Sequence, residues 1–237
     1  MKFKAIDARY FASRKEFSES YGPRELWSTI DQWPLYVGIG NLARCMAVAE
    51  MVKETLDVPG HVAEFGSWKG ANLLFMAKLL RIYSPMCQKL VHCFDGFMGL
   101  TEFSSKDGTA AEHRGAYKGS YEELLDVIKL YEMEDEVIIH KGLIEKTLPA
   151  LVESEKAMSF SLVYCDTDLY DSTSLILQSL HPRLMKGGMF VFDEWNADNY
   201  PGEGVAANEF LREFGEFYEV RAVKMARQPT MVIKKIK

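Results

Sequence analysis

The chain has 237 residues, of which 48% are hydrophobic and 26% are charged, and its formal net charge is -6 at pH 7. This length and composition suit one α/β domain of a soluble globular protein. An acidic chain argues against nucleic acid as the partner, because phosphate binding needs a basic surface. No apolar run reaches the length of a membrane span, and the charged start "MKFKAIDARYFASRKEF" is not typical of a signal peptide. We therefore expect a cytoplasmic protein with no membrane partner.

The first part of the chain has a helical pattern. Apolar residues at three- and four-residue spacing predict helices in "RELWSTIDQW" and "NLARCMAVAEMVKETL", and Pro59-Gly60 ends the second one. We interpret residues 1–57 as a helical cap or oligomerisation segment within the same domain as residues 58–237. Trp27, Trp33 and Tyr36 either cover the functional site or contact a second copy of the chain, so a homo-oligomer is left open.

From residue 58 onward, strand-like and helix-like segments alternate. Strands are expected in residues 61–65, 89–95, 135–142, 159–166 and 187–194, each followed by a helical segment, and the tail from residue 218 contains two closing strands. Five such β-α units predict a largely parallel sheet with helices on both faces. Ligands of such sheets bind beyond the carboxyl ends of the strands, so the residues at those ends are the candidates for function.

The first two strand ends combine glycines with single acids. In "AEFGSWKGAN", Glu64 closes the strand, Gly66 follows, and Gly70 opens the helix; in "HCFDGFMGL", Asp95 closes the next strand. The GxxxG spacing differs from the GxGxxG dinucleotide fingerprint. Together these residues indicate a ligand that contains adenosine, with Asp95 placed to accept the ribose hydroxyls. The alternative is structural: a capped helix start and a turn aspartate before Gly96.

Two later strand ends carry four acids. Asp166 and Asp168 follow the strand in "VYCDTDLYDST", and Asp193 and Glu194 follow the next one in "VFDEW". Residues i and i+2 of an extended chain face the same side, so Asp166 and Asp168 can share one space. Asp193 and Glu194 can share it only if the chain bends there. Such a cluster is better explained by a divalent cation such as Mg²⁺ or Ca²⁺ than by helix capping.

Five stretches in this order resemble one known family. They are "VAEFGSWKGAN", "FDGFMGL", "CDTDLYDST", "PRLMKGGMFVFDEW" and "YPGEGVAANEF". The resemblance is to the macrocin O-methyltransferase family, and it extends from about Tyr36 to Phe210. It implies an S-adenosylmethionine- and Mg²⁺-dependent sugar O-methyltransferase. The fold it implies is a class I methyltransferase with a Rossmann-like, mostly parallel sheet, an antiparallel last strand and extra N-terminal helices.

The resemblance also implies a role for each matching residue. Asp168 matches the general base, and the metal positions match Asp166, Asp193 and Glu194, where members of the family often have Asp-Asp instead of Asp193-Glu194. The cofactor positions match Glu64, Gly66, Ser67, Trp68, Gly70, Asp95, Gly96, Phe97, Gly142 and Asp166. Gly142 would lie near the adenine.

Several alternatives stay open at this point. His113 and His140 are rival bases, although His140 also suits a structural strand end. Residues 101–119 suit a mobile lid that would select the substrate. Trp195, Tyr200 and Pro201 form either an apolar wall for the acceptor or ordinary packing.

The acceptor itself is not readable from the sequence. The expected partner is a small sugar-containing molecule or a polysaccharide. A phenol or catechol O-methyltransferase is the alternative, and a nucleotide-dependent oxidoreductase or a non-catalytic nucleotide-binding protein are further ones.

Overall fold

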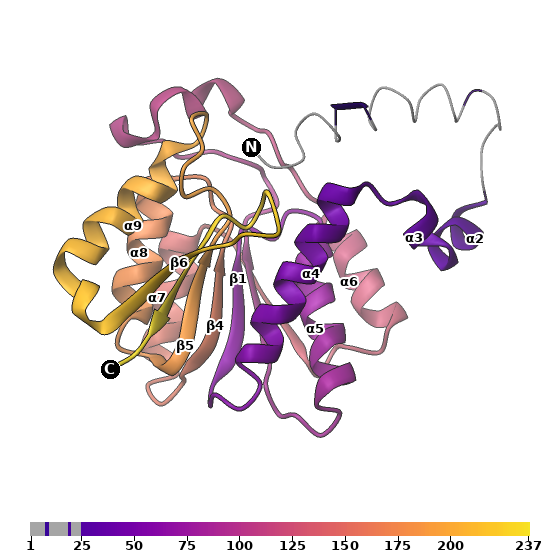
Figure 1. Cartoon of the computed structure of the whole chain (residues 1–237), viewed down its shortest axis with the longest axis horizontal. Coiled ribbons are helices and arrows are strands. Elements are labelled where there is room, and N and C mark those ends of the chain that lie inside the picture. Colours follow the sequence, from indigo (N-terminus) through magenta and orange to yellow (C-terminus); the bar gives the residue numbers. More distant parts are fainter. Residues whose placement is uncertain (1–7, 10–18, 20–24) are drawn as a thin grey trace.

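The computed structural model describes residues 8, 9, 19 and 25–237, and these residues form a layered α/β structure around one sheet (Figure 1). In the described residues the sheet has seven strands in the order β3-β2-β1-β4-β5-β7-β6. The strands are β1 (His61–Phe65), β2 (Val91–Asp95), β3 (Val137–Lys141), β4 (Phe160–Cys165), β5 (Leu184–Phe192), β6 (Tyr218–Ala222) and β7 (Met231–Lys235). Strands β1 to β5 pair in parallel, and β7 is antiparallel to both of its neighbours. The predicted mostly parallel sheet with an antiparallel last strand is confirmed.

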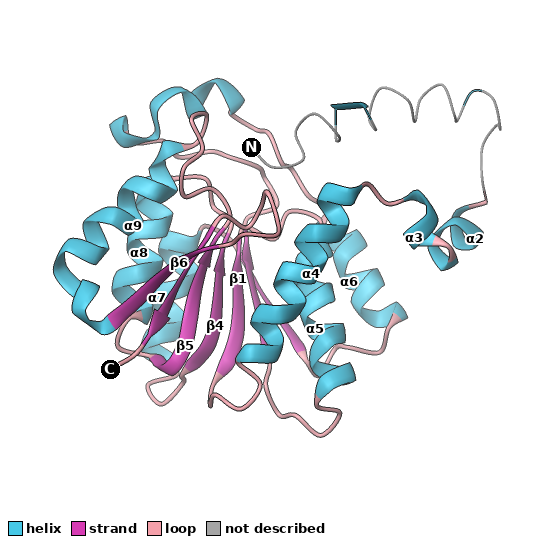
Figure 2. Ribbon diagram, viewed as in Figure 1, coloured by secondary structure: helices cyan, strands magenta, loops and turns pink. Residues whose placement is uncertain are grey.

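Helices cover both faces of the sheet, as the alternating pattern predicts. Helices α4, α5 and α6 lie on one face, and α7, α8 and α9 lie on the other (Figure 2). The helices are α2 (Leu26–Asp31), α3 (Trp33–Tyr36), α4 (Ile39–Glu54), α5 (Ala71–Tyr83), α6 (Tyr121–Leu130), α7 (Ile144–Ser154), α8 (Tyr170–Leu180) and α9 (Pro201–Phe214), with short 3₁₀ helices η1 (Ser105–His113) and η2 (Gly215–Phe217).

Strand alternation divides the buried side chains into two cores. Val62, Tyr164 and Val191 point to the α4–α6 face, whereas Cys165 and Phe192 point to the α7–α9 face. Residues two positions beyond Tyr164 and Val191 therefore leave the sheet toward the α4 side. Asp166 and Asp193 occupy those positions, so the fold alone brings these two acids of neighbouring strands together.

The N-terminal helices differ in how much they bury. Helix α4 places Ala47, Val48 and Val52 in the core on its face of the sheet. Helices α2 and α3 have no buried residues, and Trp27 and Trp33 are 52% and 44% exposed. Apart from residues 8, 9 and 19, the predicted N-terminal segment before residue 25 lies outside the described residues. No helix in the described part of the chain combines the length and apolarity needed to cross a membrane.

Candidate active site

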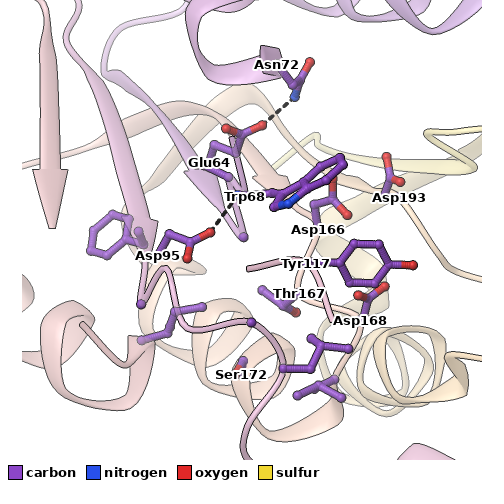
Figure 3. Close-up of a pocket in the computed structure, with 18 of the residues that line it drawn as sticks. Glu64, Trp68, Asn72, Asp95, Tyr117, Asp166, Thr167, Asp168, Ser172 and Asp193 are labelled. Carbon is purple, nitrogen blue, oxygen red and sulfur yellow. Dashed lines mark hydrogen bonds between the residues drawn. The ribbon is translucent and has the colours of Figure 1, made fainter. Parts of the chain in front are cut away.

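A cavity of about 710 Å³ opens at the carboxyl ends of the parallel strands (Figure 3). One side of it, here called the β1–β2 side, is formed by residues at and just beyond the carboxyl ends of β1 and β2, including Glu64, Gly66 and Asp95. The other side, the β4–β5 side, is formed by the residues that follow β4 and β5. The cavity lies where the sequence predicts ligands to bind, because the loops that leave parallel strands meet at one edge of the sheet.

Glu64 is the last acid of β1 before the glycine turn, and it faces the cavity. Its Oε1 accepts a hydrogen bond of 2.7 Å from Asn72 Nδ2, at the start of α5. Its Oε2 is buried and, among the described residues, has no hydrogen-bond partner. Burial raises the pKa of Glu64 to about 7, because a charged carboxylate is poorly solvated there. An unpartnered carboxylate oxygen of this kind suits a positively charged ligand group, such as an ammonium.

The glycine turn after β1 is built so that two loops can approach each other closely. Gly66 has a φ of +83°, and a Cβ atom at this position would lie 1.9 Å from the backbone oxygen of Asp166. Asp95 ties this turn to the end of β2, since its carboxylate accepts hydrogen bonds from the backbone N–H of Trp68 (2.7 Å) and of Phe97 (2.6 Å). Burial raises the pKa of Asp95, and these N–H donors oppose that shift. Each carboxylate oxygen keeps a lone pair that a ribose hydroxyl could use.

Most of the predicted cofactor residues line the cavity. Those that do are Glu64, Gly66, Ser67, Trp68, Asp95, Gly96, Gly142 and Asp166. Gly70 and Phe97 lie behind this lining. Gly70 adopts a φ of +78° at the start of α5, where a Cβ atom would lie 2.4 Å from Leu124 Cδ1. Phe97 is buried and packs on Tyr121, with 5.5 Å between the ring centroids.

All four predicted acids of the β4–β5 side line the same cavity. Asp166 and Asp168 follow β4, and Asp193 and Glu194 follow β5. Strand β5 ends at Phe192 and the chain bends at Asp193, which is why two consecutive acids reach one space. The backbone N–H of Glu194 is held by Glu203 Oε1 at 2.8 Å, from the first turn of α9. The bend that the shared site requires is therefore present.

Asp168 is held in an unusual conformation. Its φ of +62° lies in the left-handed region, which an aspartate adopts only at some cost. The start of α8 is fixed from the lid segment, because Asp107 Oδ1 accepts a hydrogen bond of 2.7 Å from the N–H of Tyr170. Asp168 is 7% exposed, and burial together with the charges of Glu194 and Asp193 raises its pKa to about 8. A carboxylate with a pKa near neutral is suited to proton transfer.

Besides Asn72, Arg44 is a functional candidate that the sequence motifs do not single out. It belongs to α4, and its guanidinium group reaches the β4–β5 side of the cavity. Nη2 donates a hydrogen bond of 2.9 Å to Asp166 Oδ2, and Nη1 donates one of 3.1 Å to Asp193 Oδ2. The signal is present in the sequence: Arg44 precedes Val48 by four residues and Met51 by seven, so a charge falls on the apolar stripe of the helix.

The acid cluster has the ligand chemistry of a hard cation site, although its geometry is not that of a bound metal. In the described part of the chain, no three His, Cys, Asp or Glu side chains are grouped so that they could hold a metal ion. Asp166 and Asp193 are paired with Arg44, and Glu194 also pairs with Gln228. Nevertheless, Oε2 of Glu194 is buried without a partner among the described residues. The carboxylate oxygens have the chemistry that Mg²⁺ or a similar ion prefers, and three of them are engaged by Arg44.

The two rival bases, His140 and His113, and the predicted wall residue Trp195 all pack against aromatic rings. His140 stacks on Phe94 and contacts His92, with 2.9 Å between the ring nitrogens, and it is not part of the cavity lining. His113 lies in η1, where its ring packs on Tyr200 with 5.3 Å between the centroids. Trp195 is buried against Phe192, which favours packing over a wall for a ligand.

The segment predicted as a lid partly covers the cavity. Thr101, Glu102 and Tyr117 belong to the lining, and Tyr117 Oη lies 3.2 Å from Tyr200 Oη. Pro201, the third residue of the predicted wall, begins α9. Tyr200, the residue before Pro201, therefore contacts Tyr117 of the lid. This contact links the lid to the segment that follows Asp193 and Glu194.

Two curated proteins with similar sequences are both named O-methyltransferases. A 4'-O-methyltransferase of Streptomyces olivaceus, which acts on 8-demethyl-8-(2,3-dimethoxy-alpha-L-rhamnosyl)-tetracenomycin C, is 29% identical over 70% of this chain. The matched stretch spans 66% of that relative, slightly less than two thirds of its length. The demethyldecarbamoylnovobiocin O-methyltransferase of Streptomyces niveus is 27% identical over 78% of this chain and 73% of its own length.

Solved structures share the fold. CalS11, a calicheamicin methyltransferase, superposes with a TM-score of 0.81 at 23% identity, over 94% of this chain and 90% of that one. The O-methyltransferase NovP gives a TM-score of 0.69 at 21% identity, over 83% of this chain and 81% of that one. The predicted class I methyltransferase fold is confirmed. The sequence model of the macrocin-O-methyltransferase (TylF) family matches residues 16–216, which is most of the chain. The chain therefore belongs to the macrocin-O-methyltransferase family.

Proposed function

We propose that this protein is an O-methyltransferase that transfers the methyl group of S-adenosylmethionine to a sugar hydroxyl of a natural product, assisted by a divalent cation. The relatives support the acceptor class, because the tetracenomycin relative is named for a rhamnosyl-bearing substrate. We also propose that it works in the cytoplasm. A phenol or catechol hydroxyl is the second acceptor class, since a carboxylate base and a cation would serve it equally.

One observation carries this proposal: a single cavity joins the β1–β2 side, with its unpartnered Glu64 oxygen, to the acid-rich β4–β5 side. The first side offers what S-adenosylmethionine needs. Asp95 can accept ribose hydroxyls, Glu64 can accept the ammonium of the methionine end, and Gly66 leaves room for close approach. The GxxxG turn lacks the pattern that a dinucleotide-dependent oxidoreductase would need, and this supports the methyltransferase proposal.

The second side offers what the acceptor needs. Methyl transfer from a sulfonium is an in-line displacement, so the acceptor oxygen must be aligned and must lose its proton. Asp168 would take that proton, because its carboxyl group lies in the cavity wall beside the acids that would hold the cation. S-adenosylmethionine supplies the methyl group when bound, and a divalent cation held by Asp166, Asp193 and Glu194 would lower the pKa of the acceptor hydroxyl.

The proposal is tested by methyl transfer to a panel of glycosides and catechols, followed by mass spectrometry. We expect the wild-type protein to methylate a glycoside and the Asp168→Asn variant to be slower by about 10²–10⁴-fold, because the base is removed. Affinity for S-adenosylhomocysteine should stay unchanged in this variant. The matched control is Asp171→Asn, the same change at an exposed position of α8, which should keep full activity. Full activity of Asp168→Asn would remove Asp168 from the mechanism, and methylation of catechols alone would exclude a sugar acceptor.

A further inference from the structure

Arg44 occupies the centre of the acid cluster on the β4–β5 side. Its two terminal nitrogens form a bidentate pair with Asp193, where Nη1–Oδ2 and Nη2–Oδ1 are both 3.1 Å. Nη2 also donates to Asp166 Oδ2 at 2.9 Å. Tyr164, beneath the guanidinium group, donates a hydrogen bond of 2.5 Å to Asp193 Oδ1, so Asp193 is held from two directions. The guanidinium group thus bridges the ends of β4 and β5.

Four carboxyl groups surround Arg44 in this cluster. Asp166, Asp168, Asp193 and Glu194 all line the cavity beside Arg44, and Oε2 of Glu194 is buried without a partner among the described residues. The side chains of Arg44 and Asp166 keep 28% and 27% of their surface exposed, on the cavity side. Arg44 therefore borders open space into which it can turn.

A divalent cation and Arg44 would need the same carboxylate oxygens. Mg²⁺ binds oxygen ligands at about 2.0–2.1 Å in an octahedral arrangement, which Asp166 and Asp193 cannot provide while both are engaged by a guanidinium group. Two cationic centres this close also repel each other. Only one of the two can hold both aspartates at a time.

We propose that Arg44 is an exchangeable internal counter-ion, which holds Asp166 and Asp193 together while no divalent cation is bound and competes with that cation for their oxygens. This inference rests on the proposed function, because it assumes that these acids bind a cation during catalysis. Arg44 is then a positioning residue that keeps the acids in place and sets how tightly the cation binds. Its place on α4 makes the N-terminal helical region part of the active site.

The test measures Mn²⁺ binding to the full chain by electron paramagnetic resonance, in saturating S-adenosylhomocysteine. We expect the Arg44→Gln variant to bind Mn²⁺ about tenfold more tightly than wild type or better, because a competing positive charge is removed. Arg44→Lys, which keeps the charge but cannot form the bidentate pair, should lie between the two. The control is Lys53→Gln, which removes a charge from an exposed position of the same helix and should match wild type.

A second readout, the Tm, applies if Arg44→Gln loses stability because Asp166 and Asp193 lose their counter-ion. Mn²⁺ should raise the Tm of this variant more than it raises the Tm of wild type, because the ion then replaces the missing charge. Equal or weaker Mn²⁺ binding by Arg44→Gln would overturn the counter-ion role and leave the metal proposal standing. If S-adenosylhomocysteine binds but Mn²⁺ binds to none of the variants, both the counter-ion role and the metal proposal fail, while methyl transfer remains.

Discussion

The two sides of the cavity both bury carboxylates, but they compensate the charge in different ways. On the β1–β2 side, each acid is held by neutral donors of nearby loops: Asp95 by two backbone N–H groups and Glu64 by Asn72. On the β4–β5 side, four acids crowd together, and the charge paired with Asp166 and Asp193 comes from Arg44, a residue 122 positions away from Asp166 along the chain. The first side is built by local geometry, whereas the second depends on a charge brought in by a distant helix.

This difference has a functional consequence. Fixed neutral donors, rather than a cation, hold the carboxyl groups of the β1–β2 side in place. On the β4–β5 side, Arg44 engages Asp166 and Asp193, so the properties of this side depend on which cation is present. We therefore expect binding on the β1–β2 side to be insensitive to divalent cations and events on the β4–β5 side to respond to them.

The largest expected effect comes from a change that affects both sides, Gly66→Ala. The new Cβ would lie 1.9 Å from the backbone oxygen of Asp166, and the φ of +83° disfavours any residue except glycine. We expect the free energy of unfolding to fall by about 3 kcal/mol and S-adenosylhomocysteine binding to be lost. Chemical denaturation and calorimetry measure these two quantities.

The control for this prediction is Gly215→Ala at the end of α9. A Cβ atom there meets no other atom within 4 Å, and its φ of -58° is helical. This control should be neutral or slightly stabilising. Normal stability and normal ligand binding in Gly66→Ala would show that the two loops do not need their close approach.

The second largest effect is expected for Asp95→Asn, which should weaken ligand binding on the β1–β2 side and leave the β4–β5 side unchanged. The neutral amide can accept only one of the two hydrogen bonds that Trp68 and Phe97 donate, and its NH₂ group would face an N–H donor. We expect the affinity for S-adenosylhomocysteine to fall by about 10- to 100-fold, with unchanged Mn²⁺ binding on the other side. Calorimetry tests this, with the exposed Asp126→Asn of α6 as a control. An unchanged affinity would contradict the role given to Asp95.

The smallest expected effect is a dependence of folding stability on pH, which arises from His92 in strand β2. His92 is buried between His61 and His140, and burial, followed by the charges of these two neighbours, lowers its pKa from 6.5 to about 3. The folded protein therefore binds fewer protons here than the unfolded chain, so stability falls as the pH drops below 6.5. His92 alone should cost about 2 kcal/mol between pH 7 and pH 5.

Denaturation at several pH values checks this prediction. The His92→Phe variant should show a flatter decline of unfolding free energy between pH 7 and pH 5, because it has no proton to bind at this position. The exposed His113→Phe of the lid serves as the control and should decline as steeply as wild type. A His92→Phe variant with the wild-type slope would place the acid sensitivity elsewhere.

The sequence predicts the parts of the site that depend on local pattern. Alternating β-α units predict the parallel sheet, and the rule of strand ends then points to Glu64, Asp95, Asp166 and Asp193, all of which line the cavity. The bend at Asp193 could be stated only as a condition, because strand alternation does not fix where a strand ends.

Arg44 and Asn72 were not found, and the reason is physical. Each acts by reaching another element, and the partner of a long polar side chain depends on how helices pack on the sheet. The apolar stripe of α4 contains the one available clue, a charge at Arg44 between residues that are buried. Such a charge indicates a buried partner without saying which of the chain's acids it meets.

Calorimetric titration of the wild-type protein with S-adenosylhomocysteine, first in EDTA and then in Mg²⁺, tests the central claim most directly. The account predicts one binding site per chain and the same micromolar affinity in both conditions, because the β1–β2 side needs no cation. The absence of binding in both conditions, with NADH binding instead, would contradict the assignment of this cavity to a methyltransferase.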